Sequence, residues 1–210
     1  MSKTLLFFFL SLFLLSCGKS GGSQNEQQAE VDLSHISTES PVPYEALTFN
    51  ANVNLVNFNQ TQEEKLLDAI ELIKKVIASE EFKNEVLNFS YAGKKQYVDT
   101  NLSNAEVYKK ILEGAEKLRP KKNNSLDITL KLYNESQNVI GYTLPSVNIV
   151  WMNTKYFNKF TPADVTGNLI HEWLHKLGFK HDFQRTKRRP FSVPYAIGYL
   201  MKSLAKKYQN

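Results

Sequence analysis

Three histidines near the end of the sequence are spaced so that they could hold one metal ion. His171 and His175 are four positions apart, so in a helix their side chains project from one face and can reach a single ion. Gly178 can adopt the left-handed conformation that turns a chain sharply, which would return His181 as a third ligand. Three protein ligands with one open position are the arrangement of a catalytic zinc. The spacing therefore predicts Zn²⁺ as the cofactor.

Glu172 is the second chemical group of this segment. It follows His171 directly, where its carboxylate could reach a water molecule on the metal rather than the metal itself, and so act as a general base. Cys17 is the single cysteine of the chain, which excludes intramolecular disulfides and cysteine-rich zinc modules. A metal must therefore be held by histidine and carboxylate. Asp182, which follows the third histidine, is expected to be a structural hydrogen-bond partner rather than a ligand.

Residues 171–181 read HEWLHKLGFKH, which resembles the HExxHxxGxxH signature of the metzincin clan of zinc endopeptidases. The resemblance implies an α+β, metzincin-like zinc-protease domain, with a mixed twisted sheet, an active-site helix and a C-terminal helix. It also implies that zinc is held by His171, His175 and His181. Peptide or protein substrates would then be hydrolysed by a metal-activated water, with Glu172 taking the proton of this water and passing it to the leaving amine.

The same resemblance directs attention to residues 192–195. In the metzincin clan, a tight turn downstream of the third histidine carries a methionine beneath the metal, and the candidate turn here has Pro194 at that place. Tyr195 resembles the tyrosine that follows this turn in astacin-like enzymes and assists the metal, although its position is offset by one residue. A plain packing role is the alternative for Tyr195.

Two rival functions remain open at this stage. The chain could be a surface lipoprotein that keeps a zinc-stabilised fold for binding a partner and cleaves nothing. It could also hydrolyse another kind of amide, such as one in peptidoglycan. Glu172 favours catalysis over the binding role, because a purely structural zinc site has no use for a base.

The elements that must position these residues can be predicted from local patterns. Thr161, Pro162 and Asp164 form a helix start and Gly178 a helix end, so residues 162–177 are expected to be the helix of the two histidines. Residues 139–144, closed by a proline, are expected to form an edge strand against which an extended peptide could pair. Three further strands are expected at 49–55, 126–133 and 147–153. One helix is expected to begin with a capping box formed by Thr61 and Glu64. Other helices are expected at 80–88, from Ser103 to Pro120, and at 197–208.

The N-terminus predicts export. Residues 5–15 form a short apolar run after Lys3, which is typical of a secretory signal and too short to span a bilayer. The run ends in Leu-Leu-Ser-Cys, which resembles the lipobox of bacterial lipoproteins and implies cleavage before Cys17 and acylation of its thiol. We expect residues 1–16 to be a signal peptide, residues 17–45 a lipidated flexible tether and residues 46–210 the catalytic domain. A chance cysteine within a cleaved signal is the alternative.

These features predict a lipid-anchored protein of the bacterial cell envelope, and Gly18 after the cysteine favours the outer membrane in that resemblance. The formal charge of +5 comes from the C-terminal end, where Arg185, Lys187, Arg188 and Arg189 cluster. This basic run lacks interleaved aromatic residues, so a solvated loop is favoured and nucleic acid is not an expected partner.

Overall fold

The computed structural model describes residues 48–136 and 138–209, and this part of the chain has an α+β architecture. The expected signal peptide, Cys17, the tether and His35 lie outside the described residues. The elements, in chain order, are β1 (Asn50–Val56), α1 (Gln60–Ile77), α2 (Glu80–Asn88), α3 (Asn104–Glu113), β2 (Ser125–Tyr133), β3 (Gly141–Thr143), β4 (Ile149–Asn153), α4 (Thr154–Phe157), α5 (Pro162–Leu177), the 3-10 helix η1 (Arg189–Phe191) and α6 (Val193–Gln209).

The described strands form one mixed, open sheet in the order β1-β2-β4-β3. Strands β1, β2 and β4 are parallel, and β3 pairs with β4 in the antiparallel direction. The expected edge strand is therefore confirmed, although it is shorter than predicted. The strand ends at Thr143, just before the Leu144-Pro145 pair. This end is expected, because proline has no N–H to donate to the ladder.

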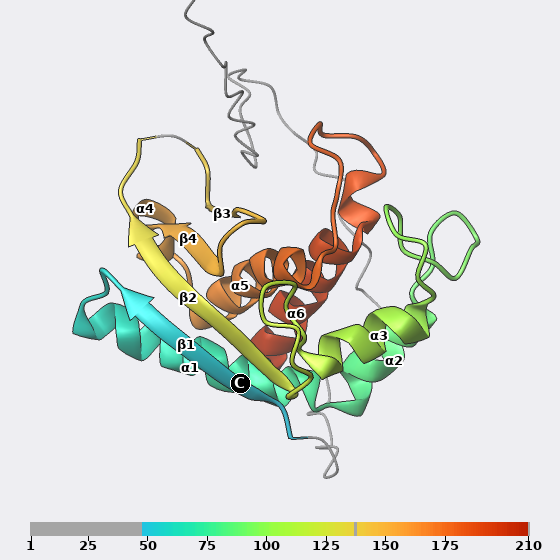
Figure 1. Ribbon diagram of the computed structural model, residues 1–210, viewed down its shortest axis with the longest axis horizontal. Helices are drawn as coiled ribbons and strands as arrows, with labels where there is room; N and C mark the ends of the chain where they lie inside the picture. The colour runs from blue at the N-terminus through green and yellow to red at the C-terminus, as the bar shows by residue number, and fades with distance from the viewer. Residues whose placement is uncertain (1–47, 137, 210) are drawn as a thin grey trace, which may run out of the picture.

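The core lies between one face of the sheet and the helices. Alternate residues of β2 are buried while their neighbours are half-buried, which is the two-residue period of a strand with one covered face. Helices α1, α5 and α6 pack against one another on that side (Figure 1), and α2 with α3 extends the helical layer beyond the end of the sheet. The buried residues of β2 in this core are Leu126, Ile128, Leu130 and Leu132.

Three helix boundaries differ from the predicted ones. Helix α1 begins earlier than Thr61, because Asn59 and Gln62 form the reciprocal capping box. Helix α3 opens at Ser103 as predicted, but it ends at Gly114 instead of continuing to Pro120. Gly114 has a φ of 62°, and a Cβ there would lie 2.2 Å from the Ser125 carbonyl oxygen, so this position requires glycine.

The third difference concerns the last helix. Helix α6 begins at Val193 rather than near Ile197, because the Ala196 N–H already donates to the Ser192 carbonyl at 2.9 Å. Pro194 is tolerated in this first turn, where a backbone N–H has no helical partner to lose. Residues 192–195, the candidate turn, therefore lead into a helix. The short elements α4 and η1 were not predicted. Within the described residues, no helix combines the length and apolar character needed to span a bilayer.

Candidate metal centre

Helix α5 spans the predicted residues, and its caps fix the direction of both of its histidines. The Thr161 hydroxyl accepts the Asp164 N–H, while the Asp164 carboxylate accepts the Thr161 N–H at 3.1 Å. This capping box satisfies two of the free backbone donors at the helix start. The apolar face holds the helix in the core, and its buried members are Val165, Leu169, Ile170, Trp173, Leu174 and Leu177. The two histidines are therefore carried by a rigid, deeply packed element.

A tight turn after α5 brings the third histidine back to the first two. Gly178 has a φ of 98°, and the N–H of the buried Phe179 donates to the Leu174 carbonyl at 3.1 Å. The potential ligand atoms of His171, His175 and His181 all lie within 4.8 Å of one another, and they form a group that could hold a metal ion. The sequence prediction of three converging imidazoles agrees with this geometry.

Hydrogen bonds orient two of the three imidazoles. The Nδ1 atom of His175 is 2.9 Å from the Phe179 carbonyl oxygen, and that of His181 is 2.9 Å from the Asp182 carbonyl oxygen. A carbonyl only accepts, so each of these two ring nitrogens carries the hydrogen and the other nitrogen keeps its lone pair. Three converging imidazoles, two of them oriented in this way, are a donor set that fits a zinc ion.

The electrostatics of the cluster favour the same protonation state. Burial lowers the pKa of His171 well below its usual value, and it also lowers the pKa values of His175 and His181, the latter to about 4. The Arg189 guanidinium lowers all three pKa values further. At neutral pH the three side chains are therefore uncharged, which is the state in which imidazole binds a metal.

Glu172 lies against the edge strand, next to the histidines on the same helix. Its side chain is buried, and a Cβ placed on Gly141 of β3 would lie 3.6 Å from its Cγ. Its Oε2 atom is buried without a hydrogen-bond partner among the described residues. Burial raises the pKa of Glu172 to about 8, and the nearby Lys176 ammonium opposes this effect. Glu81 and Glu116 also have a buried carboxylate oxygen without a partner among the described residues, so the position of Glu172 beside the histidines is what distinguishes it.

Lys176 connects α5, the helix of the candidate metal centre, to the edge strand, and the sequence pattern did not single it out. Its Nζ donates to the carbonyls of Leu144 and Val147 at 2.7 and 2.6 Å, in the turn between β3 and β4. Burial lowers its pKa to about 8. Gly141 lets β3 approach α5 closely, because a Cβ there would lie 3.1 Å from the Asn168 amide oxygen. The edge strand is thus held beside Glu172.

Tyr195 lies beside the histidine cluster at the start of α6. Its ring centroid is 4.5 Å from that of His171 and 4.8 Å from that of His181. Pro194, which directly precedes it, is buried, and its backbone interacts with His171. The structure therefore brings Tyr195 to two of the three histidines, His171 and His181. Met201, the last methionine of the sequence, is buried in the core within α6.

Arg189 was predicted as part of a solvated basic loop, and this prediction is wrong. Its neighbours Arg185, Lys187 and Arg188 are exposed, whereas Arg189 is only 7% exposed. Its Nη2 donates a hydrogen bond to the Tyr195 hydroxyl, and its Nη1 donates to the Phe183 carbonyl at 3.3 Å. Arginine in a charged run gives no local sign of burial, and only the packing of η1 against α6 distinguishes this one.

Asp182 has the structural role predicted for it. The Thr186 hydroxyl donates to its carboxylate at 2.6 Å, which shapes the loop after His181. Among the described residues, the group that could hold a metal includes the three histidines and not Asp182.

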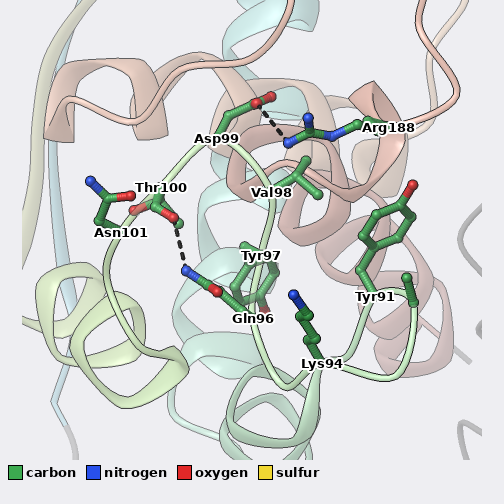
Figure 2. Close-up of a pocket in the computed structure, with 10 residues that line it drawn as sticks. Tyr91, Lys94, Gln96, Tyr97, Val98, Asp99, Thr100, Asn101 and Arg188 are labelled. Carbon is green, nitrogen blue, oxygen red and sulfur yellow. Dashed lines mark hydrogen bonds and ion pairs between the residues drawn. The ribbon is translucent and has the colours of Figure 1, made fainter.

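A pocket of about 600 Å³ lies on the neighbouring loop between α2 and α3 (Figure 2). The loop that lines this pocket contacts the segment after His181. The Val98 N–H donates to the Phe191 carbonyl at 3.1 Å, and the Arg188 guanidinium lies 3.7 Å from the Asp99 carboxylate. None of the three histidines lines this pocket, nor does Glu172. It is therefore a separate feature that borders the same loop.

No protein-family model matches the chain, and no curated protein is similar enough in sequence to count as a relative. A functional assignment must therefore come from the residues of the site.

Proposed function

We propose that the chain is a zinc-dependent endopeptidase with a metzincin-like catalytic domain. The observation that carries this proposal is the convergence of three imidazoles within 4.8 Å beside a buried carboxylate of the same helix. The oriented ring hydrogens of two of the histidines and the HExxHxxGxxH pattern support it. An α+β fold with an antiparallel edge strand next to the motif helix is compatible with the metzincin-like domain that the motif implies.

The proposed reaction divides its tasks among particular residues. His171, His175 and His181 would hold the zinc, which when bound supplies Lewis acidity that activates water and polarises a carbonyl group. Glu172 takes the proton of the attacking water on its carboxylate and delivers it to the nitrogen of the departing amine. Tyr195 lies against His171 and His181 and can donate a hydrogen bond to the carbonyl oxygen of the substrate.

The edge strand would hold the substrate. Strand β3 pairs with β4 on one side only, so its other edge offers backbone donors and acceptors to an extended peptide. Lys176 and Gly141 keep this strand close to Glu172. A peptide added at this edge would therefore pass along the helix that carries the general base.

The rival is a zinc-stabilised surface lipoprotein that binds a partner without cleaving it. A structural site would retain the three histidines, but it has no use for an acid–base group beside them, and Glu172 directly follows the first histidine with its side chain buried. This feature of Glu172 favours the enzyme.

The decisive experiment is incubation of the zinc-loaded full chain in detergent with a mixed peptide library, read by mass spectrometry. We expect internal peptide bonds to be cleaved, and cleavage to stop when a chelator removes the metal. Activity that persists at full rate in the metal-free protein would contradict the proposal. Intact peptides in every sample would favour the binding module, and release of amides from peptidoglycan alone would favour the third alternative.

We further propose that acylated Cys17 tethers the protein to the bacterial envelope. Replacing Cys17 with serine should abolish labelling by a radioactive or clickable fatty acid and release the protein from the membrane fraction, because the thiol is the only acceptor that the lipobox resemblance provides. Ser16→Ala is the matched control and should leave labelling largely unchanged. Labelling that survives in Cys17→Ser would contradict the lipobox interpretation.

A further inference from the structure

A buried cation, Arg189, contacts Tyr195 beside the candidate centre, and the proposed reaction does not use it. Among the described residues, its side-chain partners are the Tyr195 hydroxyl and the Phe183 carbonyl, and its Nε is buried with no hydrogen-bond partner there. No carboxylate in residues 48–136 or 138–209 lies within ion-pair distance of it. A buried guanidinium without a counter-charge is unfavourable for folding. The groups that the guanidinium contacts therefore indicate its functional role.

The main contact of Arg189 is Tyr195. The guanidinium carbon lies 4.7 Å from the centroid of the Tyr195 ring, in addition to the hydrogen bond between Nη2 and the hydroxyl. The same ring packs on His171 and His181. Tyr195 thus contacts both a buried cation and two proposed metal ligands.

The chemistry of the two groups sets the direction of the hydrogen bond. A guanidinium has only donors, so the Tyr195 oxygen must accept from Arg189. The hydroxyl hydrogen must then point away from Arg189, and the charge of the donor polarises the O–H bond. An oxygen already occupied by a cation is a poor ligand for a second cation, so this contact favours hydrogen-bond donation by Tyr195 over metal ligation.

We propose that Arg189 is a positioning residue that fixes Tyr195 as a hydrogen-bond donor to the carbonyl oxygen of the scissile peptide bond. This inference rests on the proposed peptidase function. Because the charge on that oxygen increases as the water attacks, a donor fixed in advance stabilises the transition state more than the bound substrate. Arg189 therefore acts on kcat through Tyr195, and it touches neither substrate nor metal.

A double-mutant cycle tests the inference. The zinc-loaded full chain in detergent is compared as wild type, Arg189→Met, Tyr195→Phe and the double variant, on one peptide that the wild type cleaves. We expect Tyr195→Phe to lower kcat by about a hundredfold to a thousandfold, as for other donors to an oxyanion, with little change in KM. Arg189→Met should lower kcat by at least about tenfold, and the double variant should be no slower than Tyr195→Phe alone.

Two further variants separate positioning from folding. Arg188→Met removes an exposed arginine of the same loop and should keep wild-type kcat. Arg189→Lys retains the charge and most of the apolar stem but lacks the planar guanidinium. This variant should fold even if Arg189→Met does not, and its kcat should still be lower than that of the wild type. Multiplicative losses in the double variant, or wild-type kcat in Arg189→Lys and Arg189→Met, would overturn the inference.

The contact can also be measured without catalysis. In chain labelled with ¹³C at the tyrosine ζ carbon, the Tyr195 resonance is identified by its loss in Tyr195→Phe. This resonance should move in Arg189→Met and stay in place in Arg188→Met, with and without zinc. An unmoved resonance would overturn the Arg189 contact even in an active enzyme. If the resonance moves but the protein cleaves no peptide, the contact exists and the proposed function is wrong. The donor role of Tyr195 rests on that function and would be wrong as well.

Discussion

Replacing His175 with alanine is expected to leave the protein without zinc, whereas the wild type should hold close to one zinc per chain. Three imidazoles converge at the site, two of them with a ring nitrogen hydrogen-bonded to a backbone carbonyl, and the variant would keep only two of the three. Loss of even an outer-shell partner weakens metal binding by about tenfold to a hundredfold, so loss of a ligand should weaken it by more than about a hundredfold. Elemental analysis after dialysis, followed by competition with a chromogenic chelator, measures both the content and the affinity.

His35→Ala is the matched control, because His35 is the one other histidine of the sequence and belongs to the expected tether. It should retain wild-type zinc content and affinity. If His175→Ala also retained one tightly bound zinc, the metal would have to be elsewhere, and the candidate centre would lose its assignment.

Helix α5, which carries two histidines of the candidate centre, could be predicted from the sequence because its determinants are local. Thr161, Pro162 and Asp164 define its start, and Gly178 defines its end, within a few residues of the positions they control. The return of His181 depends on the same glycine. The strands next to the site were also found from period and proline placement, since alternate burial and a closing Pro145 are properties of a few adjacent residues.

Residues whose role depends on distant packing could not be predicted in this way. Lys176 looks like an ordinary helix-terminal lysine, yet its ammonium is buried on two carbonyls from the β3–β4 turn. Arg189 looks like one more cation of a basic loop, yet it lies under Tyr195. Such assignments require knowledge of which elements pack against one another, and a single sequence does not provide it.

Glu116 shows the same dependence on tertiary structure at the back of the motif helix. Its carboxylate accepts the Trp173 indole N–H at 2.7 Å and the Asp127 backbone N–H at 2.9 Å, so it connects α5 to β2. Burial raises the pKa of Glu116, while these hydrogen bonds lower it. Helix α5 is therefore fixed on both sides. Trp173 connects it to β2 through Glu116, and Lys176 connects it to the turn after the edge strand β3. A rigid scaffold of this kind is what a site needs to keep a base in place.

The fold and the metal centre alone do not distinguish an enzyme from a binding module, and Glu172 is the residue that does. Glu172→Gln has almost the same shape as the native side chain and does not change a metal ligand, so we expect fold and zinc content to be retained. The amide cannot take a proton from water, so kcat for peptide cleavage should fall by about a hundredfold to ten-thousandfold.

Glu63→Gln is the matched control for this experiment, because Glu63 is exposed on α1 and its substitution should leave cleavage unchanged. Zinc content, the melting temperature and the cleavage rate are measured on the same preparations of the full chain. If Glu172→Gln cleaved peptides at the wild-type rate, the general-base role would be refuted. If the zinc-loaded wild type cleaved no peptide and Glu172→Gln were equally well folded, then the buried carboxylate would have no catalytic purpose, and the zinc-stabilised binding module would replace the enzyme.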